Sequence, residues 1–263
     1  MRESLNKSQI ERFSRQLVLK NIGAKGQKKI LSSKILIVGV GGLGCPAAEN
    51  LVRAGIGTIG LVDNDIINLS NIHRQSLFTS KDIKKSKVSV AAKKLREINP
   101  STKIKTYKSR LNKNNIKNII KDYEIIIDGS DNFKTKFLIN DFCVKLKKKL
   151  VTGAISKFDG HVFTFDFNDK KTASLKSFYQ ENEISDNDLN CEFEGVLGTT
   201  ASIVGTTQAN EALKMIMKIG QTLKNQILII DLLNLNFRKV KFCLLYTSPS
   251  PRDQRGSRMA AGG

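Results

Sequence analysis

The chain has 263 residues, of which 40% are hydrophobic and 26% charged, and its net charge is +20. This composition is typical of an ordinary soluble protein, and the apolar stretches are strand-sized, far short of the ~18 residues of a membrane span. The lysines are scattered through every segment, so the charge gives only weak support for an anionic ligand. Because no apolar run near the start resembles a signal peptide, we expect a cytoplasmic protein.

Strand-like and helix-like segments alternate through the first half of the chain. This alternation predicts a parallel sheet with helices on its faces. The predicted strands are residues 35–38, 59–62, 104–107 and 124–128, and the predicted helices are residues 46–54, 80–98, 112–121 and 132–147.

The pattern changes after the apolar stretch at residues 150–153. Residues 161–167 alternate with a period of two, which favours antiparallel pairing. A helix at 199–218 and closing strands at 227–231 and 236–242 complete the series. We therefore predict an α/β fold with a Rossmann-like mixed sheet, mostly parallel in the N-terminal half and with antiparallel strands in the C-terminal half.

Two polar segments are expected outside this framework. Residues 168–190 carry no strong period, which suits a mobile loop over a site. Residues 244–263 are rich in Pro, Ser, Arg and Gly, with no apolar face to bury, and residues 244–253 resemble a translated sequencing adapter. We predict a single domain over residues 1–243 and a disordered, non-native tail over residues 244–263.

A glycine run follows the first predicted strand and opens a helix. Its glycines, Gly39, Gly41, Gly42 and Gly44, have the spacing that lets backbone approach phosphates at a helix N-terminus. Asp63 ends the next strand, where a carboxylate accepts hydrogen bonds from ribose hydroxyls. The combination predicts an adenine-nucleotide site with NAD as its default ligand, and tight strand–helix packing is the alternative reason for the glycines.

Further polar residues distinguish a triphosphate from a dinucleotide. Asn71, Arg74 and Gln75 follow Asp63, and Lys87 and Asp131 come later. We expect them to meet at the carboxyl edge of the sheet, where two cations and a carboxylate suit a triphosphate with magnesium. Asp131 also suits the N-cap of the helix at 132–147, and Lys87 suits a solvated helix face.

These residues, with several further stretches, resemble the ThiF/MoeB/HesA family, bacterial relatives of ubiquitin-activating enzymes. The resemblance covers residues 11–242, and its other matching stretches are residues 12–16, 63–65, 69–75, 129–132, 191–198 and 208–214. It implies an adenylyltransferase that uses ATP to adenylate the C-terminal glycine carboxylate of a small ubiquitin-like sulfur-carrier protein. The carrier would be MoaD- or ThiS-like, for molybdopterin or thiamine biosynthesis.

The resemblance also implies roles for individual residues. Asp63 binds ribose, Asn71, Arg74 and Lys87 bind phosphates, and Asp131 binds magnesium. Asp65 and Gln75 join the nucleotide site. Arg15 reaches the phosphates across a homodimer interface. Cys191 takes part in thiol chemistry in some members, and a small buried apolar residue is the alternative for this position.

The four cysteines, Cys45, Cys143, Cys191 and Cys243, form no CxxC pair, so reduced thiols are expected. Many family members hold a zinc ion with two CxxC pairs. The first pair is absent here, around residues 171–176, and the second would fall near Cys243, where the tail begins. We therefore predict no zinc.

Three rival functions remain open from the sequence. The first is a tRNA-modifying relative that activates a carboxylate on an adenosine, although a nucleic-acid partner is not expected. The second is an NAD-dependent oxidoreductase, which has no use for Arg74, Lys87 and Asp131. The third is a noncatalytic scaffold, disfavoured because every expected catalytic position is filled.

Overall fold

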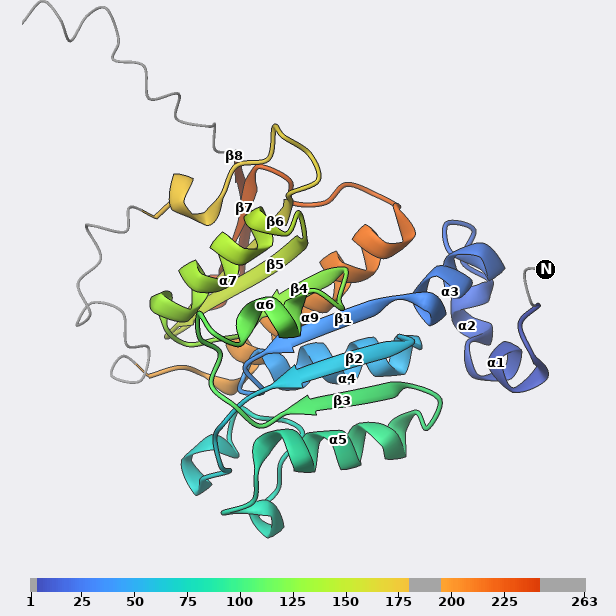
Figure 1. Cartoon of the computed structure of the whole chain (residues 1–263), viewed down its shortest axis with the longest axis horizontal. Helices are drawn as coiled ribbons and strands as arrows, with labels where there is room; N and C mark the ends of the chain where they lie inside the picture. The colour runs from blue at the N-terminus through green and yellow to red at the C-terminus, as the bar shows by residue number, and fades with distance from the viewer. Residues whose placement is uncertain (1–3, 180–194, 242–263) are drawn as a thin grey trace, which may run out of the picture.

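The computed structural model describes residues 4–179 and 195–241, which contain one eight-stranded sheet (Figure 1). Its strand order is β3-β2-β1-β4-β5-β6-β7-β8. The first five strands by sequence pair in parallel, and β6, β7 and β8 pair antiparallel, which confirms the predicted mixed sheet. The strands are β1 Lys34–Val38, β2 Thr58–Val62, β3 Lys103–Tyr107, β4 Ile125–Asp128, β5 Lys149–Ser156, β6 Asp159–Asp166, β7 Gln226–Asp231 and β8 Asn236–Lys241.

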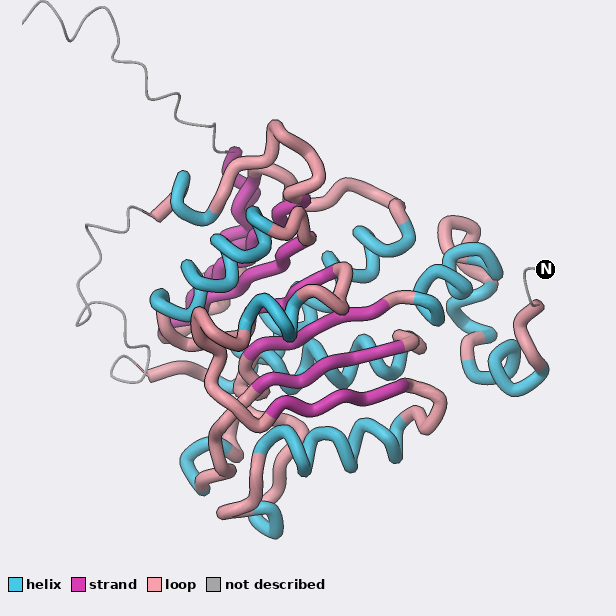
Figure 2. The backbone as a smooth tube through the Cα atoms, viewed as in Figure 1, coloured by secondary structure: helices cyan, strands magenta, loops and turns pink. Residues whose placement is uncertain are grey.

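Helices cover both faces of the sheet (Figure 2). Side chains alternate across each strand, so Ile35 and Ile37 of β1 join the core under α4, α5 and α9, whereas Leu36 and Val38 join the core under α6 and α7. The α-helices in the described residues are α1 Lys7–Arg12, α2 Ser14–Leu17, α3 Gly23–Ser32, α4 Gly44–Ala54, α5 Lys87–Ile98, α6 Ile116–Ile120, α7 Phe133–Lys145 and α9 Gly198–Met217.

The N-terminal helices α1 to α3 pack against the amino edge of the parallel strands (Figure 1). Gln27 donates to the carbonyl of Ala54 at 3.0 Å, and Arg12 donates to the carbonyl of Ile98 at 3.0 Å. Both carbonyls lie at helix ends that lead into strands. The buried Phe13 packs so closely on the left-handed turn at Gly55 that a Cβ there would lie 2.4 Å from its ring. This layer is therefore remote from the carboxyl ends of the strands.

Two predicted helices are shorter than expected because polar side chains fold the preceding residues into turns. The segment predicted as a helix at 80–98 contains a short 3₁₀ turn, Ser80–Asp82, before α5 begins at Lys87. Asp82 accepts from the backbone and hydroxyl of Thr79, and Lys84 has a φ of 67°, which ends the turn.

The start of the predicted helix at 112–121 is likewise a turn. Asn112 accepts from the backbone of Asn114 and Asn115, so α6 begins only at Ile116. Both errors arise from side-chain-to-backbone hydrogen bonds that compete with helix formation.

Part of the polar stretch at 168–190 is packed. Ala173 and Leu175 are buried, and the backbone of Leu175 donates to Asn140 at 3.0 Å. Residues 180–190 of that predicted loop, Cys191 and the predicted tail lie outside the described residues. Over the residues that the structure describes, none of the helices has the length and apolar character needed to cross a membrane.

Candidate functional site

A pocket of about 480 Å³ opens at the carboxyl edge of the parallel strands. Here the chain order switches, because β1 pairs with β2 on one side and with β4 on the other. The connections that follow β1 and β4 lead to helices on opposite faces, which opens a crevice between them. Residues from the loops after β1, β2, β3 and β4 line it.

Two glycines of the glycine run are required by packing within the protein. Gly39 has a φ of 86°, and a Cβ there would lie 2.8 Å from the carbonyl oxygen of Gly129. A Cβ on Gly44 would lie 1.9 Å from the carbonyl oxygen of Gly39. These glycines let the loops after β1 and β4 touch and let α4 begin directly beneath them. The packing interpretation therefore holds for Gly39 and Gly44.

Gly41 differs, because little in the protein requires a glycine there. A Cβ on it would meet only the amide nitrogen of Gln75, at 3.7 Å, which is ordinary contact. Gln75 is itself 3% exposed and lines the pocket, and its side-chain oxygen has no hydrogen-bond partner among the described residues. An open backbone with an unsatisfied buried amide beside it fits a ligand that approaches the main chain closely. Gly42, which also lines the pocket, packs on Ala201.

Asp63 holds the glycine loop from the end of β2. One carboxylate oxygen accepts from the backbone N–H of Val40 at 2.8 Å, and the other accepts from that of Asp65 at 2.8 Å. Burial raises the pKa of Asp63, and Lys87 and the two backbone N–H groups oppose that rise. The carboxylate keeps acceptor capacity on the pocket side, where it suits hydroxyl donors.

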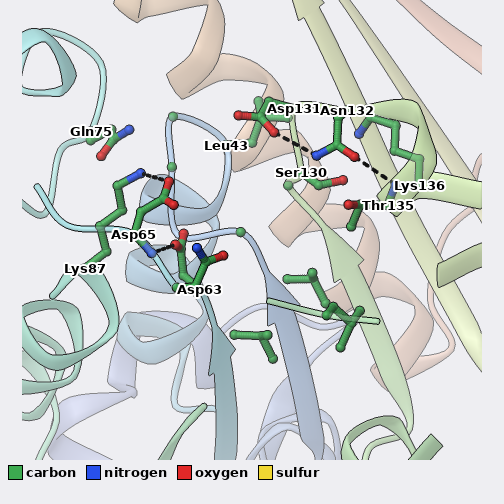
Figure 3. Close-up of a pocket in the computed structure, with 18 of the residues that line it drawn as sticks. Leu43, Asp63, Asp65, Gln75, Lys87, Ser130, Asp131, Asn132, Thr135 and Lys136 are labelled. Atoms are coloured by element: carbon green, nitrogen blue, oxygen red, sulfur yellow. Dashed lines mark hydrogen bonds and ion pairs between the residues drawn. The ribbon is translucent and has the colours of Figure 1, made fainter. Parts of the chain in front are cut away.

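Lys87 is buried rather than solvated, contrary to the alternative considered from the sequence. Its ammonium group forms an ion pair with Asp65 at 2.9 Å, and its side chain is 8% exposed against 56% for that of Asp65 (Figure 3). Lys87 begins α5, and its backbone donates to the carbonyl of Asp65, so the two chain segments are joined twice. The pairing directs a desolvated cation toward the pocket.

Arg74 stands on a short turn that follows Asn71. Its guanidinium donates to the carbonyl of Ser70 at 3.0 Å and lies 2.8 Å from the ring nitrogen of His73. In the described part of the chain these partners include no carboxylate, so the charge of Arg74 is not neutralised locally. Asn71 accepts from the backbone of Asn68 at 3.1 Å, which stabilises the turn, and both Asn71 and Arg74 line the pocket.

Asp131 lies on the opposite wall of the pocket from Lys87 (Figure 3). The N-cap of α7 is Asn132, whose side chain accepts from the backbone of Thr135 at 2.9 Å, so the N-cap alternative for Asp131 is wrong. Its described side-chain contact is with the amide of Asn132 at 3.1 Å. An exposed carboxylate with such light engagement suits a hard cation such as magnesium.

Several lining residues were not predicted from the sequence. Ser109 and Arg110 follow β3, and Thr135 and Lys136 come from the start of α7. The rule that placed Asp63 also applies to Arg110, because β3 ends at the same sheet edge. Lys136 had no comparable sequence signal, since it is one lysine among many.

Two further predicted residues, Arg15 and Cys191, remain to be located. Arg15 is exposed on α2, at the amino edge, and does not line the pocket. Cys191 lies outside the described residues. Cys45 is near the pocket, but burial raises its pKa to about 12, so it remains a protonated thiol without nucleophilic character.

No group of three or more His, Cys, Asp and Glu side chains is placed to hold a metal ion within residues 4–179 and 195–241. Cys191 and Cys243 lie outside these ranges, so the absence of zinc stays a prediction.

Fold and pocket together define a Rossmann-like α/β protein whose site lies at the switch point of a mixed sheet. The model of the ThiF family matches residues 13–245, which is most of the chain. This chain belongs to the ThiF family, as the sequence resemblance predicted.

Curated relatives carry adenylyltransferase names. The chain is 42% identical over 231 residues to a probable molybdopterin-synthase adenylyltransferase of Porphyra purpurea, covering 88% of this chain and 60% of that protein. It is 36% identical over 237 residues to a sulfur carrier protein adenylyltransferase of Thermus thermophilus, and this match covers 89% of this chain and 88% of that protein. The chain is also 40% identical over 238 residues to the adenylyltransferase and sulfurtransferase MOCS3 of Drosophila virilis. That match covers 90% of this chain but only 52% of the relative.

The fold also matches solved structures. The crystal structure of E. coli MccB with ATP superposes with a TM-score of 0.80 at 22% identity, covering 93% of this chain and 74% of that chain. The crystal structure of PaaA gives a TM-score of 0.77 at 20% identity, and the match covers 92% of this chain and 76% of that chain. At this level of identity the likeness establishes the shared fold.

The two kinds of glycine are expected to respond differently to alanine. Gly41→Ala should leave the free energy of unfolding nearly unchanged but weaken ATP binding at least about tenfold, because its methyl group occupies space meant for a ligand. Gly44→Ala should lower the free energy of unfolding by about 1–3 kcal/mol or more, because its methyl group meets backbone. Denaturant melts and calorimetric ATP titrations measure both, and unchanged ATP affinity in folded Gly41→Ala would contradict the assignment.

Proposed function

We propose that this chain is an adenylyltransferase that activates the C-terminal carboxylate of a sulfur-carrier protein with magnesium ATP. One observation carries the proposal: a glycine loop anchored by Asp63 faces the cations Arg74 and Lys87 on one side and the lightly engaged Asp131 on the other. Family membership and the relatives' names support it.

The arrangement suits a reaction between two anions. A carboxylate is already ionised at neutral pH, so adenylation needs little base catalysis and mainly requires alignment and charge stabilisation. Arg74 and the buried Lys87 would stabilise charge on the phosphates and on the leaving pyrophosphate. Asp131 would hold a magnesium ion, which supplies further charge neutralisation when bound. The products would be carrier adenylate and pyrophosphate.

Two rivals predict different ligands. An NAD-dependent oxidoreductase shares the glycine loop and Asp63, but its dinucleotide pyrophosphate gives no role to Asp131. A tRNA-modifying relative would use the net charge of +20 and would bind tRNA with strong salt dependence. The names of the relatives favour the carrier protein as substrate. Titrating the protein with ATP, NADH and tRNA separates the three, and we expect ATP alone to bind tightly.

Carrier-dependent exchange of labelled pyrophosphate into ATP tests the activity. We expect exchange only when a carrier ending in Gly-Gly is present, because the reversible step needs an attacking carboxylate. Arg74→Ala and Asp131→Ala should each reduce the exchange rate at least about 100-fold, the loss typical of removing a group that stabilises transition-state charge.

Matched controls lie far from the pocket. Arg53→Ala removes an exposed arginine paired with Glu49, and Asp122→Ala removes a half-exposed carboxylate near Lys105. Both should keep nearly full exchange. Absence of exchange by the wild-type chain with MoaD-like and ThiS-like carriers would sink the proposal, and the carrier that works identifies the pathway.

The position of Arg15 supports a homodimer as the working form. Arg15 belongs to the layer at the amino edge, and its own pocket opens at the carboxyl edge (Figure 1). It is exposed on a short helix that is followed by the exposed apolar residues Val18 and Leu19, which suits contact with a second copy. A role for Arg15 at the phosphates therefore requires the pocket of a partner subunit.

Mixing two inactive variants tests this dimer. Arg15→Ala and Arg74→Ala should each lack exchange alone. If the two variants are refolded together, each mixed dimer holds one pocket with an intact Arg74 that receives an intact Arg15 from the other subunit. Random pairing makes about half of the dimers mixed, so about a quarter of all pockets are intact and roughly a quarter of wild-type exchange should return. No recovery in verified mixed dimers, or an active Arg15→Ala homodimer, would contradict the shared site.

A further inference from the structure

A second ion pair lies beneath the pocket wall that carries Asp131. Asp128 ends β4 with its side chain 1% exposed, and Lys136 is the fourth residue of α7, with its side chain 5% exposed. Their charged atoms are 3.1 Å apart. Burying two charges is costly unless the geometry and the remaining hydrogen bonds are good, so this pair requires a structural or functional reason.

The carboxylate of Asp128 is fully engaged. One oxygen accepts from the backbone N–H of Ser130 at 2.9 Å and from its hydroxyl at 2.5 Å. The other accepts from Lys136 and, at 2.6 Å, from the hydroxyl of Thr152 on β5. The carboxylate therefore fixes the turn that begins at Gly129.

Lys136 ties this turn to its surroundings. Besides Asp128, its ammonium group donates to the carbonyl of Gly153 at 2.6 Å. The next residues of β5, Ala154 and Ile155, line the pocket. Lys136 itself also lines it (Figure 3). One buried cation thus connects the end of β4, the first turns of α7 and the pocket-lining end of β5.

Asp131 depends on this arrangement because it has little support of its own. It is exposed, its described side-chain partner is Asn132, and it lies between Ser130, which Asp128 holds, and the helix that carries Lys136. The place of its carboxylate is therefore determined by the backbone of the turn. A small movement of that turn would move the carboxylate relative to the phosphate-facing side of the pocket.

We propose that Lys136 is a positioning residue, which holds Asp128 and through it the Gly129–Asn132 turn, so that Asp131 meets magnesium bound with ATP. The inference rests on the proposed function and extends it to a residue with no assigned role. Lys136 acts through its neighbours, in the way that outer partners orient metal ligands.

The test compares Lys136→Met, Lys136→Arg and the control Lys134→Met. Methionine keeps most of the volume of the lysine side chain but removes its positive charge and its hydrogen-bond donors. Arginine keeps the charge and the donors. Lys134 is an exposed lysine on the same helix. The readout is ATP affinity by calorimetry over a range of Mg²⁺ concentrations, with EDTA as the metal-free reference.

We expect Mg²⁺ to tighten ATP binding by the wild-type chain. In Lys136→Met the Mg²⁺ concentration for half-maximal tightening should rise about tenfold or more, the usual effect of losing an outer partner of a metal ligand. The affinity of the same variant in EDTA is the reference from which its tightening is measured. Lys136→Arg should recover most of the loss, and Lys134→Met should match wild type. If Lys136 had a purely structural role, Lys136→Met would instead lower the free energy of unfolding. The folded protein would then show the same dependence of ATP affinity on Mg²⁺ as the wild type.

Ser130→Ala provides a second variant if Lys136→Met does not fold, because it removes only the hydroxyl that donates to Asp128. It should also raise the half-saturating Mg²⁺ concentration. If the half-saturating Mg²⁺ concentration is unaltered in folded Lys136→Met, the positioning role of Lys136 is overturned but the proposed function is not. If Lys136→Met does not fold, the same result in Ser130→Ala has the same meaning. Absence of Mg²⁺-dependent tightening in the wild type would overturn both this inference and the magnesium role of Asp131. Failure of pyrophosphate exchange despite that tightening would count against the proposed function only.

Discussion

The backbone after β1 and the backbone after β4 touch at the switch point of the sheet, and the pocket depends on this contact. Gly39 lies so close to Gly129 that a side chain would collide with the opposing carbonyl. The two loops can then diverge to opposite faces, one into α4 and the other toward α7. The glycine loop and Asp131 consequently face a common space although they are far apart in the sequence.

Carboxylates at strand ends, Asp63 partly buried and Asp128 fully buried, stabilise both walls of this space. Asp63 accepts from the backbone of Val40 in the glycine loop, and Asp128 accepts from the backbone of Ser130 in the opposite loop. Each is accompanied by a buried lysine, Lys87 near Asp63 and Lys136 beside Asp128. Rigid anion-binding geometry of this kind costs little reorganisation when a charged ligand arrives, which is the condition for effective electrostatic catalysis.

The sequence predicted the parts of the site that follow from strand ends and glycine spacing. The βαβ alternation placed the glycine loop, Asp63 and Asp131 at one edge, and the sheet confirmed their convergence. The sequence could not show that Gly44 serves packing while Gly41 faces the pocket, because that depends on which atoms of distant segments approach each glycine.

The surroundings of the lysines were the feature that was hardest to predict from the sequence. The sequence allowed Lys87 a place in the nucleotide site or on a solvated helix face. The turn held by Thr79 and Asp82 precedes α5, which begins at Lys87 with its side chain buried. Lys136 gains its role only from contact with Asp128 and Gly153, which are brought together by strand pairing. The helix boundaries at 80–98 and 112–121 were wrong for a related reason, because local side-chain hydrogen bonds outweighed apolar periodicity.

The proposed reaction requires the pocket to present the α-phosphorus of ATP to a carboxylate, and an oxygen-isotope experiment shows whether it does. A carrier protein with an ¹⁸O-labelled C-terminal carboxylate is incubated with Mg-ATP and this chain, and the adenylate is then cleaved by an added amine. The proposed reaction predicts one labelled oxygen in the AMP released, because the bond between that oxygen and phosphorus survives the cleavage. Label in inorganic phosphate, or unlabelled AMP, would contradict attack by the carboxylate on the α-phosphorus.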